Sequence, residues 1–106
     1  MKHWIWISFD LGVKGDYEGI YRWLDERQAK ECGDSVAGLS YEHSGDLLDD
    51  LTKDLRESVE LTAKSRAYVI RLIDGKMKGK FILGRRRNAA WSGYAETGDQ
   101  EEDTNG

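Results

Sequence analysis

The chain has 106 residues, a length typical of one domain, and its 39% hydrophobic and 34% charged residues are an ordinary balance for a soluble domain. One cysteine and no proline exclude an internal disulfide framework and a proline-rich linker. The net charge of -4 hides an asymmetry, because residues 66–95 carry eight Lys or Arg and one Asp, whereas residues 96–106 carry five acids and no base. The basic block suits an anionic partner, and the acidic tail is able to shield it.

No apolar run reaches the roughly 18 residues of a membrane span. The first ten residues turn polar too early for a signal peptide. The lone cysteine, Cys32, is typical of a reducing compartment. We therefore expect a cytoplasmic protein with no membrane partner.

Periodicity predicts the elements in chain order. Predicted strands alternate apolar and polar positions, and predicted helices carry apolar residues three or four positions apart. Asp16 and Asp46 are suited to cap the two helices, and Asp74-Gly75 is a strong hairpin turn. The predicted elements are a strand at residues 3–11, a helix at 17–30, two short strands within 29–44, a helix from Asp46 to about Leu61, and strands at Arg66–Ile73 and near Lys80–Leu83.

This order predicts an α+β fold, a ferredoxin-like βαββαβ sandwich with an additional C-terminal strand, in which two helices cover one face of an antiparallel sheet. Residues 1–95 form this single domain. Residues 96–106 are expected to be a disordered acidic tail, because they hold too little apolar surface to order themselves. The other sheet face stays open and carries Trp4 and Trp6. Exposing each indole costs about 1.5–3 kcal/mol, so we expect something to cover them.

Three short motifs carry a resemblance. Residues 5–11 (IWISFDL) form a strand that ends in an acid, and a helix beginning at Tyr17 follows. Residues 33–35 (GDS) form a turn before another strand, and residues 89–94 (AAWSGY) follow the last strand pair. In this order the motifs resemble the superfamily of small ferredoxin-like proteins that includes the CRISPR spacer-acquisition subunit, the VapD toxins and the SinR-family proteins.

The resemblance implies a homodimer whose open sheet faces stack, with Trp4 and Trp6 in the interface and Asp10 beside its symmetry mate. In some members such an acid pair binds a divalent metal for phosphodiester cleavage, and other members use the scaffold without cleavage. This chain lacks a second acid next to Asp10, and its hairpin is shorter and more basic. A divalent-metal-dependent endonuclease and a non-catalytic protein are therefore both open interpretations.

Asp10 and Ser8 are the candidate catalytic residues. Magnesium prefers hard oxygen ligands, so Asp10 is the candidate metal ligand and Mg²⁺ the candidate cofactor. Ser8, on the same strand face, would bind phosphate or orient a water. The alternatives are an acid that accepts hydrogen bonds from the following loop, and a serine tolerated at an interface. Trp4 and Trp6 also have two interpretations, a dimer contact or a stacking platform for single-stranded RNA.

The basic residues between positions 66 and 95 are the candidate nucleic-acid contacts. Lysine and arginine neutralise phosphates and release counterions. The alternation of lysines along the hairpin aims them to one side, although edge lysines also protect a sheet from aggregation. The candidate set is Arg71, Lys76, Lys78, Lys80, Arg85, Arg86, Arg87 and Trp91.

His3, Cys32 and His43 lack the short paired spacings of zinc motifs, so the sequence predicts no metal site from them. The expected function is a small, dimeric, nucleic-acid-associated protein. The alternative is a non-enzymatic module that binds a protein partner, such as an antitoxin, inhibitor or adaptor in a defence or toxin–antitoxin system.

Overall fold

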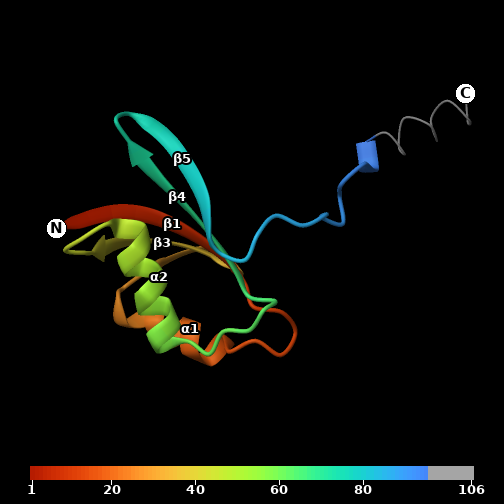
Figure 1. Cartoon of the computed structure of the whole chain (residues 1–106), viewed down its shortest axis with the longest axis horizontal. Helices are drawn as coiled ribbons and strands as arrows, with labels where there is room; N and C mark the ends of the chain where they lie inside the picture. Colours follow the sequence, from red (N-terminus) through yellow and green to blue (C-terminus); the bar gives the residue numbers. More distant parts are fainter. Residues whose placement is uncertain (96–106) are drawn as a thin grey trace, which may run out of the picture.

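A computed structural model of the protein describes residues 1–95. The chain is an α+β fold with a ferredoxin-like arrangement (Figure 1). Its elements are β1 (Lys2–Asp10), α1 (Tyr17–Glu26), β2 (Lys30–Gly33), β3 (Val36–Glu42), α2 (Leu47–Ser58), β4 (Arg66–Ile73) and β5 (Lys76–Leu83). The predicted acidic tail, residues 96–106, lies outside the described residues.

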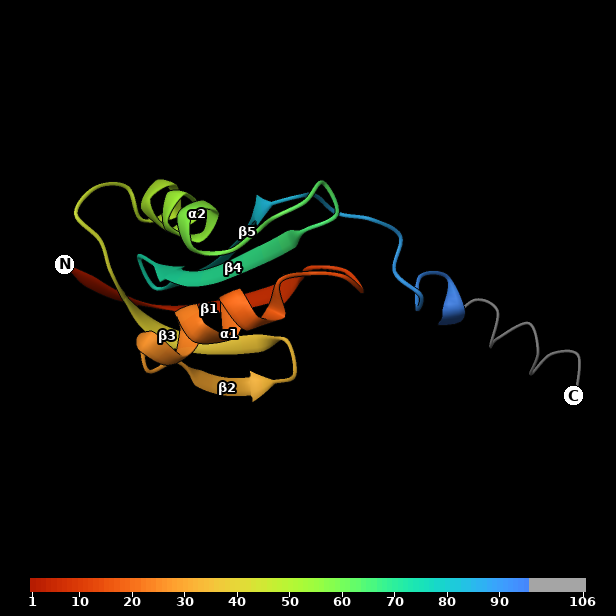
Figure 2. The same cartoon turned by 90° about the horizontal axis from the view of Figure 1, so that it is seen from below.

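The five strands form one antiparallel sheet in the order β2-β3-β1-β4-β5, with β1 at its centre. Both helices lie on one face of this sheet (Figure 2). On that face Ile5, Ile7 and Phe9 of β1 are at most 4% exposed and belong to one core with Leu51 and Leu55 of α2. The predicted fold class is confirmed, including the additional strand that pairs with β4.

Both predicted helices are too long at their C-terminal ends. α1 ends at Glu26, because Gln28 adopts a left-handed φ of 55° through which a helix does not continue. α2 ends at Ser58 instead of near Leu61, because Val59 is extended and buries its side chain. After α1 the chain enters β2 at Lys30, and after α2 it passes through residues 59–65 before β4 begins at Arg66.

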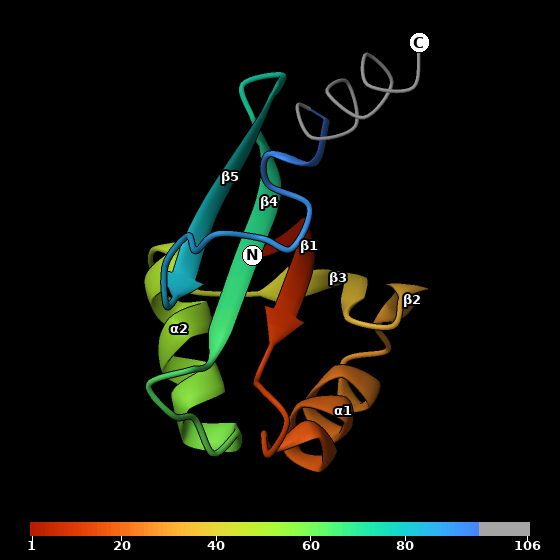
Figure 3. The same cartoon turned by 90° about the vertical axis from the view of Figure 1, so that its right-hand side faces the viewer.

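The last hairpin is longer than predicted, since β5 begins at Lys76 and not near Lys80. Asp74 and Gly75 both have positive φ, 51° and 78°, as a two-residue hairpin turn of the primed type requires. Such a turn pairs the strands from the residues that flank it, here Ile73 and Lys76. The hairpin projects away from the helical layer (Figure 3), and every residue from Lys76 to Lys80 is exposed.

Neither helix within residues 1–95 has the length and apolar composition needed to cross a membrane.

Candidate nucleic-acid interface

Four cations lie on one face of the β4–β5 hairpin, and we call them the basic ribbon. Arg71 on β4 lies directly opposite Lys78 on β5, and Lys76 and Lys80 share the face of Lys78, because alternate residues of a strand point the same way. None of the four forms an ion pair or a side-chain hydrogen bond within residues 1–95. Like charges directly opposite one another destabilise a sheet, so this arrangement of cations does not contribute to the stability of the hairpin.

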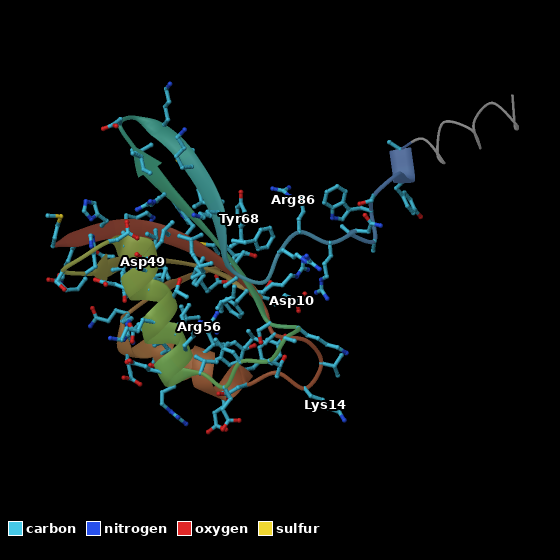
Figure 4. All side chains as sticks on the ribbon, viewed as in Figure 1. Asp10, Lys14, Asp49, Arg56, Tyr68 and Arg86 are labelled. Carbon is cyan, nitrogen blue, oxygen red and sulfur yellow. The ribbon has the colours of Figure 1, made fainter. Side chains whose placement is uncertain are left out.

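The basic ribbon lies on the helix side of the sheet. Lys80 pairs with Val69, which belongs to the core beneath the helices. Lys80 also lines an open cavity of about 580 Å³ between β5 and α2, together with Asp49 and Arg56, both labelled on α2 in Figure 4. The wall of this cavity carries both signs of charge, whereas the charged side chains on this face of the two projecting strands are all cations, beside the apolar Ile73.

The open face of the sheet carries an apolar patch formed by Trp4, Trp6, Ile70, Leu72 and Met77. The two indoles meet edge to face with ring centroids 6.0 Å apart, and Trp4 stays 42% exposed. Trp6 lies opposite Ile70, and Leu72 lies opposite Met77. Leu72 and Met77 are 60% and 58% exposed. Both tryptophans therefore lie on the uncovered face where the sequence placed them, and the hairpin enlarges the apolar surface.

The open face also carries an aromatic pair that the sequence analysis missed. Tyr68 on β4 lies opposite Phe81 on β5, and their ring centroids are 4.8 Å apart. Tyr68 lies over Gly79, where a Cβ atom would overlap its hydroxyl group. The available signal was the alternation of Tyr68 with Ile70 along β4, which places both residues on the face opposite the core.

Asp10 ends β1 and uses both carboxylate oxygens. Oδ1 accepts a hydrogen bond of 3.1 Å from the Gly12 N–H. Oδ2 accepts one of 3.2 Å from the Arg66 guanidinium and lies 3.5 Å from Arg87. The Gly12 bond first, and the Arg66 bond second, hold the pKa of Asp10 below its ordinary value. Asp10 therefore accepts a hydrogen bond from the loop that follows its strand, as one of the two interpretations expected, and it also contacts two arginines.

Ser8 is exposed on the open face of the sheet, opposite Tyr68, and its side chain forms no hydrogen bond within residues 1–95.

Among residues 1–95, no three His, Cys, Asp or Glu side chains gather in a way that would hold a metal ion. The structure does bring His3 and His43 together, with 2.6 Å between two ring nitrogens. Their separation of 40 residues gave the sequence analysis no reason to connect them.

A second basic cluster, the arginine cluster, lies at the opposite end of the hairpin from the turn. Arg85 and Arg87 line an open cavity of about 490 Å³ together with Lys64 and Arg66. The Nε atom of Arg66 is buried without a hydrogen-bond partner, although its terminal nitrogen bonds Asp10. Four cations therefore face one cavity, and a single carboxylate partly balances two of them.

Arg86 and Trp91 lie apart from that cavity. Figure 4 shows Arg86 on the other side of its segment from Asp10. Trp91 follows in the segment after β5 and is 78% exposed. The structure thus divides the predicted basic set into the basic ribbon near the turn, the arginine cluster near Asp10, and two exposed side chains beyond them.

Comparisons with known proteins identify no relative. A scan against models of known protein families matched none of them. Searches of curated proteins and of solved structures likewise found no match.

Proposed function

We propose that the protein binds nucleic acid through the phosphate backbone, with the basic ribbon as the primary contact. The observation that carries this proposal is the cross-strand pair of Arg71 and Lys78, two cations held opposite each other, neither of which forms an ion pair with a carboxylate among residues 1–95. A phosphate between them would remove their repulsion and release counterions into solution. Such binding is independent of sequence and sensitive to salt.

The arginine cluster is the second contact in this proposal. Arg66 and Arg71 are five residues apart on β4, which corresponds to about 17 Å along the strand. That length matches roughly five nucleotides of helical rise in one strand. Arg66 lies opposite Asp10 on the open face, whereas Arg71 lies on the helix side, so one nucleic-acid strand of this length would reach both only by passing around the edge strand β5.

For the apolar patch we propose a second copy of the chain. Aromatic residues and methionine are enriched in interface cores, and the patch combines two tryptophans with Met77. The resemblance to the spacer-acquisition-subunit superfamily supports the same arrangement, and membership of that superfamily is part of this proposal. Stacking of unpaired bases on Trp4 is the competing use of this face, and the oligomeric state distinguishes the two.

The proposal is binding without cleavage. Both oxygens of Asp10 are already hydrogen-bonded, so a Mg²⁺ ion at this carboxylate would have to displace the Arg66 and Arg87 guanidinium groups. The nuclease alternative makes a distinct prediction, namely magnesium-dependent cleavage that Asp10→Asn abolishes while binding stays intact.

The test is a titration of labelled single-stranded RNA, single-stranded DNA and duplex DNA by fluorescence anisotropy over a series of salt concentrations. We expect binding at low salt whose logarithmic salt slope becomes shallower by roughly 0.7–0.9 for each phosphate contact removed in Arg71→Gln and Lys78→Gln. Lys14→Gln is the matched control, because Lys14 is an exposed lysine on the β1–α1 loop, far from the hairpin (Figure 4). Absence of binding at low salt, or equal losses in the control, would refute the proposal.

The protein-interaction module remains the second candidate, because the projecting hairpin exposes Leu72 and Met77, and Met77 lies on the edge strand β5, whose outer side pairs with no strand among residues 1–95. Capture of one stoichiometric protein by the immobilised chain, unchanged by nuclease treatment, would favour this candidate. Recovery of nucleic acid alone would exclude it.

A further inference from the structure

His3 and His43 meet at the start of the β1–β3 ladder. His3 lies opposite Tyr41, and His43 is two residues farther along, so the two histidines are diagonal neighbours on one face. The ladder continues past the strand ends, because the His43 N–H donates to the Met1 carbonyl at 2.9 Å. As a result, Nδ1 of His3 lies 2.6 Å from Nε2 of His43, and the ring centroids are 4.8 Å apart.

The backbone fixes the tautomer of His43. Its Nδ1–H donates to the Gly45 carbonyl at 2.8 Å, and a carbonyl only accepts. In the neutral ring, Nε2 therefore carries the lone pair, and that lone pair is directed at His3. Histidines that bind metals commonly donate their second ring N–H to a backbone carbonyl in this way, which orients the ring and raises its basicity.

His3 is able to present a second lone pair to the same point. Its Nδ1 faces His43, and its Nε2 has no partner within residues 1–95, so Nε2 is free to carry the ring proton. The shared hydrogen bond then gives way to two unprotonated nitrogens that converge from adjacent strands. No carboxylate or cation forms an ion pair with either ring within that part of the chain.

We propose that His3 and His43 form a two-ligand site for a borderline divalent transition metal such as Zn²⁺, Ni²⁺ or Cu²⁺. Imidazole nitrogens bind these ions at about 2.0–2.1 Å, which requires the two nitrogens to be about 3 Å apart. The two nitrogens, now 2.6 Å apart, would have to separate by about 0.4 Å; His3 is exposed and bonds no other described group, so its ring is the one that would turn. Water fills the other coordination positions, because both histidines line an open cavity of about 690 Å³. Mg²⁺ and Ca²⁺ are excluded as occupants, since they require oxygen ligands.

Arg71 of the basic ribbon lines the same cavity as the two histidines, but the metal ligands and the phosphate contacts are different side chains, so metal binding by the free chain and nucleic-acid binding can each fail without the other. The test is isothermal titration of the full chain, without a polyhistidine tag, by ZnCl₂, NiCl₂, CuCl₂ and MgCl₂. We expect one transition-metal ion per chain and no heat of binding for Mg²⁺. His3→Gln and His43→Gln are each expected to weaken binding by at least about tenfold, since loss of a ligand exceeds the effect of losing an outer hydrogen bond.

The matched control is Cys32→Ser, which replaces the exposed free thiol and is expected to leave the affinity unchanged. Circular dichroism confirms that each variant is folded. The paramagnetic broadening by Cu²⁺ of both histidine ring signals in proton NMR provides a readout that does not depend on the variants. Undiminished Zn²⁺ binding in the double His variant, or one ion per two chains with dimer formation, would overturn the intrachain site.

Discussion

Trp4 of β1 lies over Gly38 of β3, the strand beside it. A Cβ atom added to Gly38 would stand 2.5 Å from Cζ2 of the indole, closer than carbon atoms normally approach. The missing side chain thus makes room for the aromatic ring on the open face. Tyr68 has the same relationship to Gly79 on the other side of the sheet centre. Two strand glycines, which carry no sequence motif, therefore shape the surface that the tryptophans form.

We predict that Gly38→Ala displaces Trp4 and lowers the free energy of unfolding by about 1 kcal/mol, the low end of overpacking costs because the indole is able to move outward. Urea denaturation measures the loss, and a red shift of tryptophan emission reports the displaced ring. In a Trp4→Ala background the same glycine substitution should become neutral or stabilising, because no ring remains to clash. Ser40→Ala, an exposed position on the same strand face, is the control. An undiminished loss in the Trp4→Ala background would show that the cause is elsewhere.

We predict that Lys78→Glu changes the stability of the protein and its binding to nucleic acid in opposite directions. The substitution turns a repulsive cross-strand pair with Arg71 into an attractive one, so we expect the protein to become more stable by about 0.2–1 kcal/mol. Binding to nucleic acid should weaken at the same time, because a phosphate contact is replaced by a like charge. Chemical denaturation and anisotropy on one preparation measure both effects. Lys14→Glu makes the same charge change on a loop and should change neither the free energy of unfolding nor the affinity strongly. A Lys78→Glu variant that binds nucleic acid as well as wild type would contradict the proposal.

The sequence predicted the sheet well because its signals are local. Alternation identified β4 to the residue, and Asp74-Gly75 identified the turn. The start of β5 was missed because Lys76 to Lys80 show no apolar alternation, even though the turn type alone requires pairing from Ile73 and Lys76. The pairing of residues 76–80 with β4 is therefore determined by the turn and the strand register more than by hydrophobic burial.

The candidate sites were harder to predict because they depend on strand register. Asp10 meets Arg66 and Arg87 across 56 and 77 residues of sequence, and spacing says nothing about such contacts. The histidine pair depends on the β1–β3 register, since a one-residue slip would turn one ring to the other face. Sequence periodicity did correctly separate the core side of β1 from the side that carries Trp4.

We predict that Asp10→Asn reduces stability at neutral pH and has no effect in acid. The folded pKa of Asp10 is lowered, so the folded state holds this proton less tightly than the unfolded state. The stabilisation is therefore complete above the unfolded pKa of about 3.9 and is lost as the pH falls through the folded value. The loss should be at most about 1 kcal/mol, because the carboxylate is half exposed and screened.

Free energies of unfolding for wild type and Asp10→Asn between pH 2 and pH 7 measure this effect. Asparagine keeps an acceptor for the Gly12 N–H, so the comparison removes the charge together with the two arginine contacts of Oδ2. Contributions from other acids with lowered pKa, such as Asp16 and Asp50, cancel in the difference. A difference that persists unchanged at the lowest pH would mean that the arginine contacts of Asp10 contribute nothing through charge.

The apolar patch leads to a prediction about assembly. Leu72 is 60% exposed on the projecting hairpin, so Leu72→Glu removes little from the core of the monomer. In a dimer that stacks the open faces, the same change buries a carboxylate without a partner, which is strongly unfavourable. We therefore expect wild type to sediment as a dimer and Leu72→Glu as a folded monomer. Val13 is a fully exposed aliphatic residue on the β1–α1 loop, away from the patch. Val13→Glu likewise replaces an aliphatic side chain by a carboxylate, and this variant should remain a dimer. If wild type is already monomeric at high micromolar concentration, the open face is free, and the tryptophans become the first place to look for stacked bases by fluorescence quenching with single-stranded RNA.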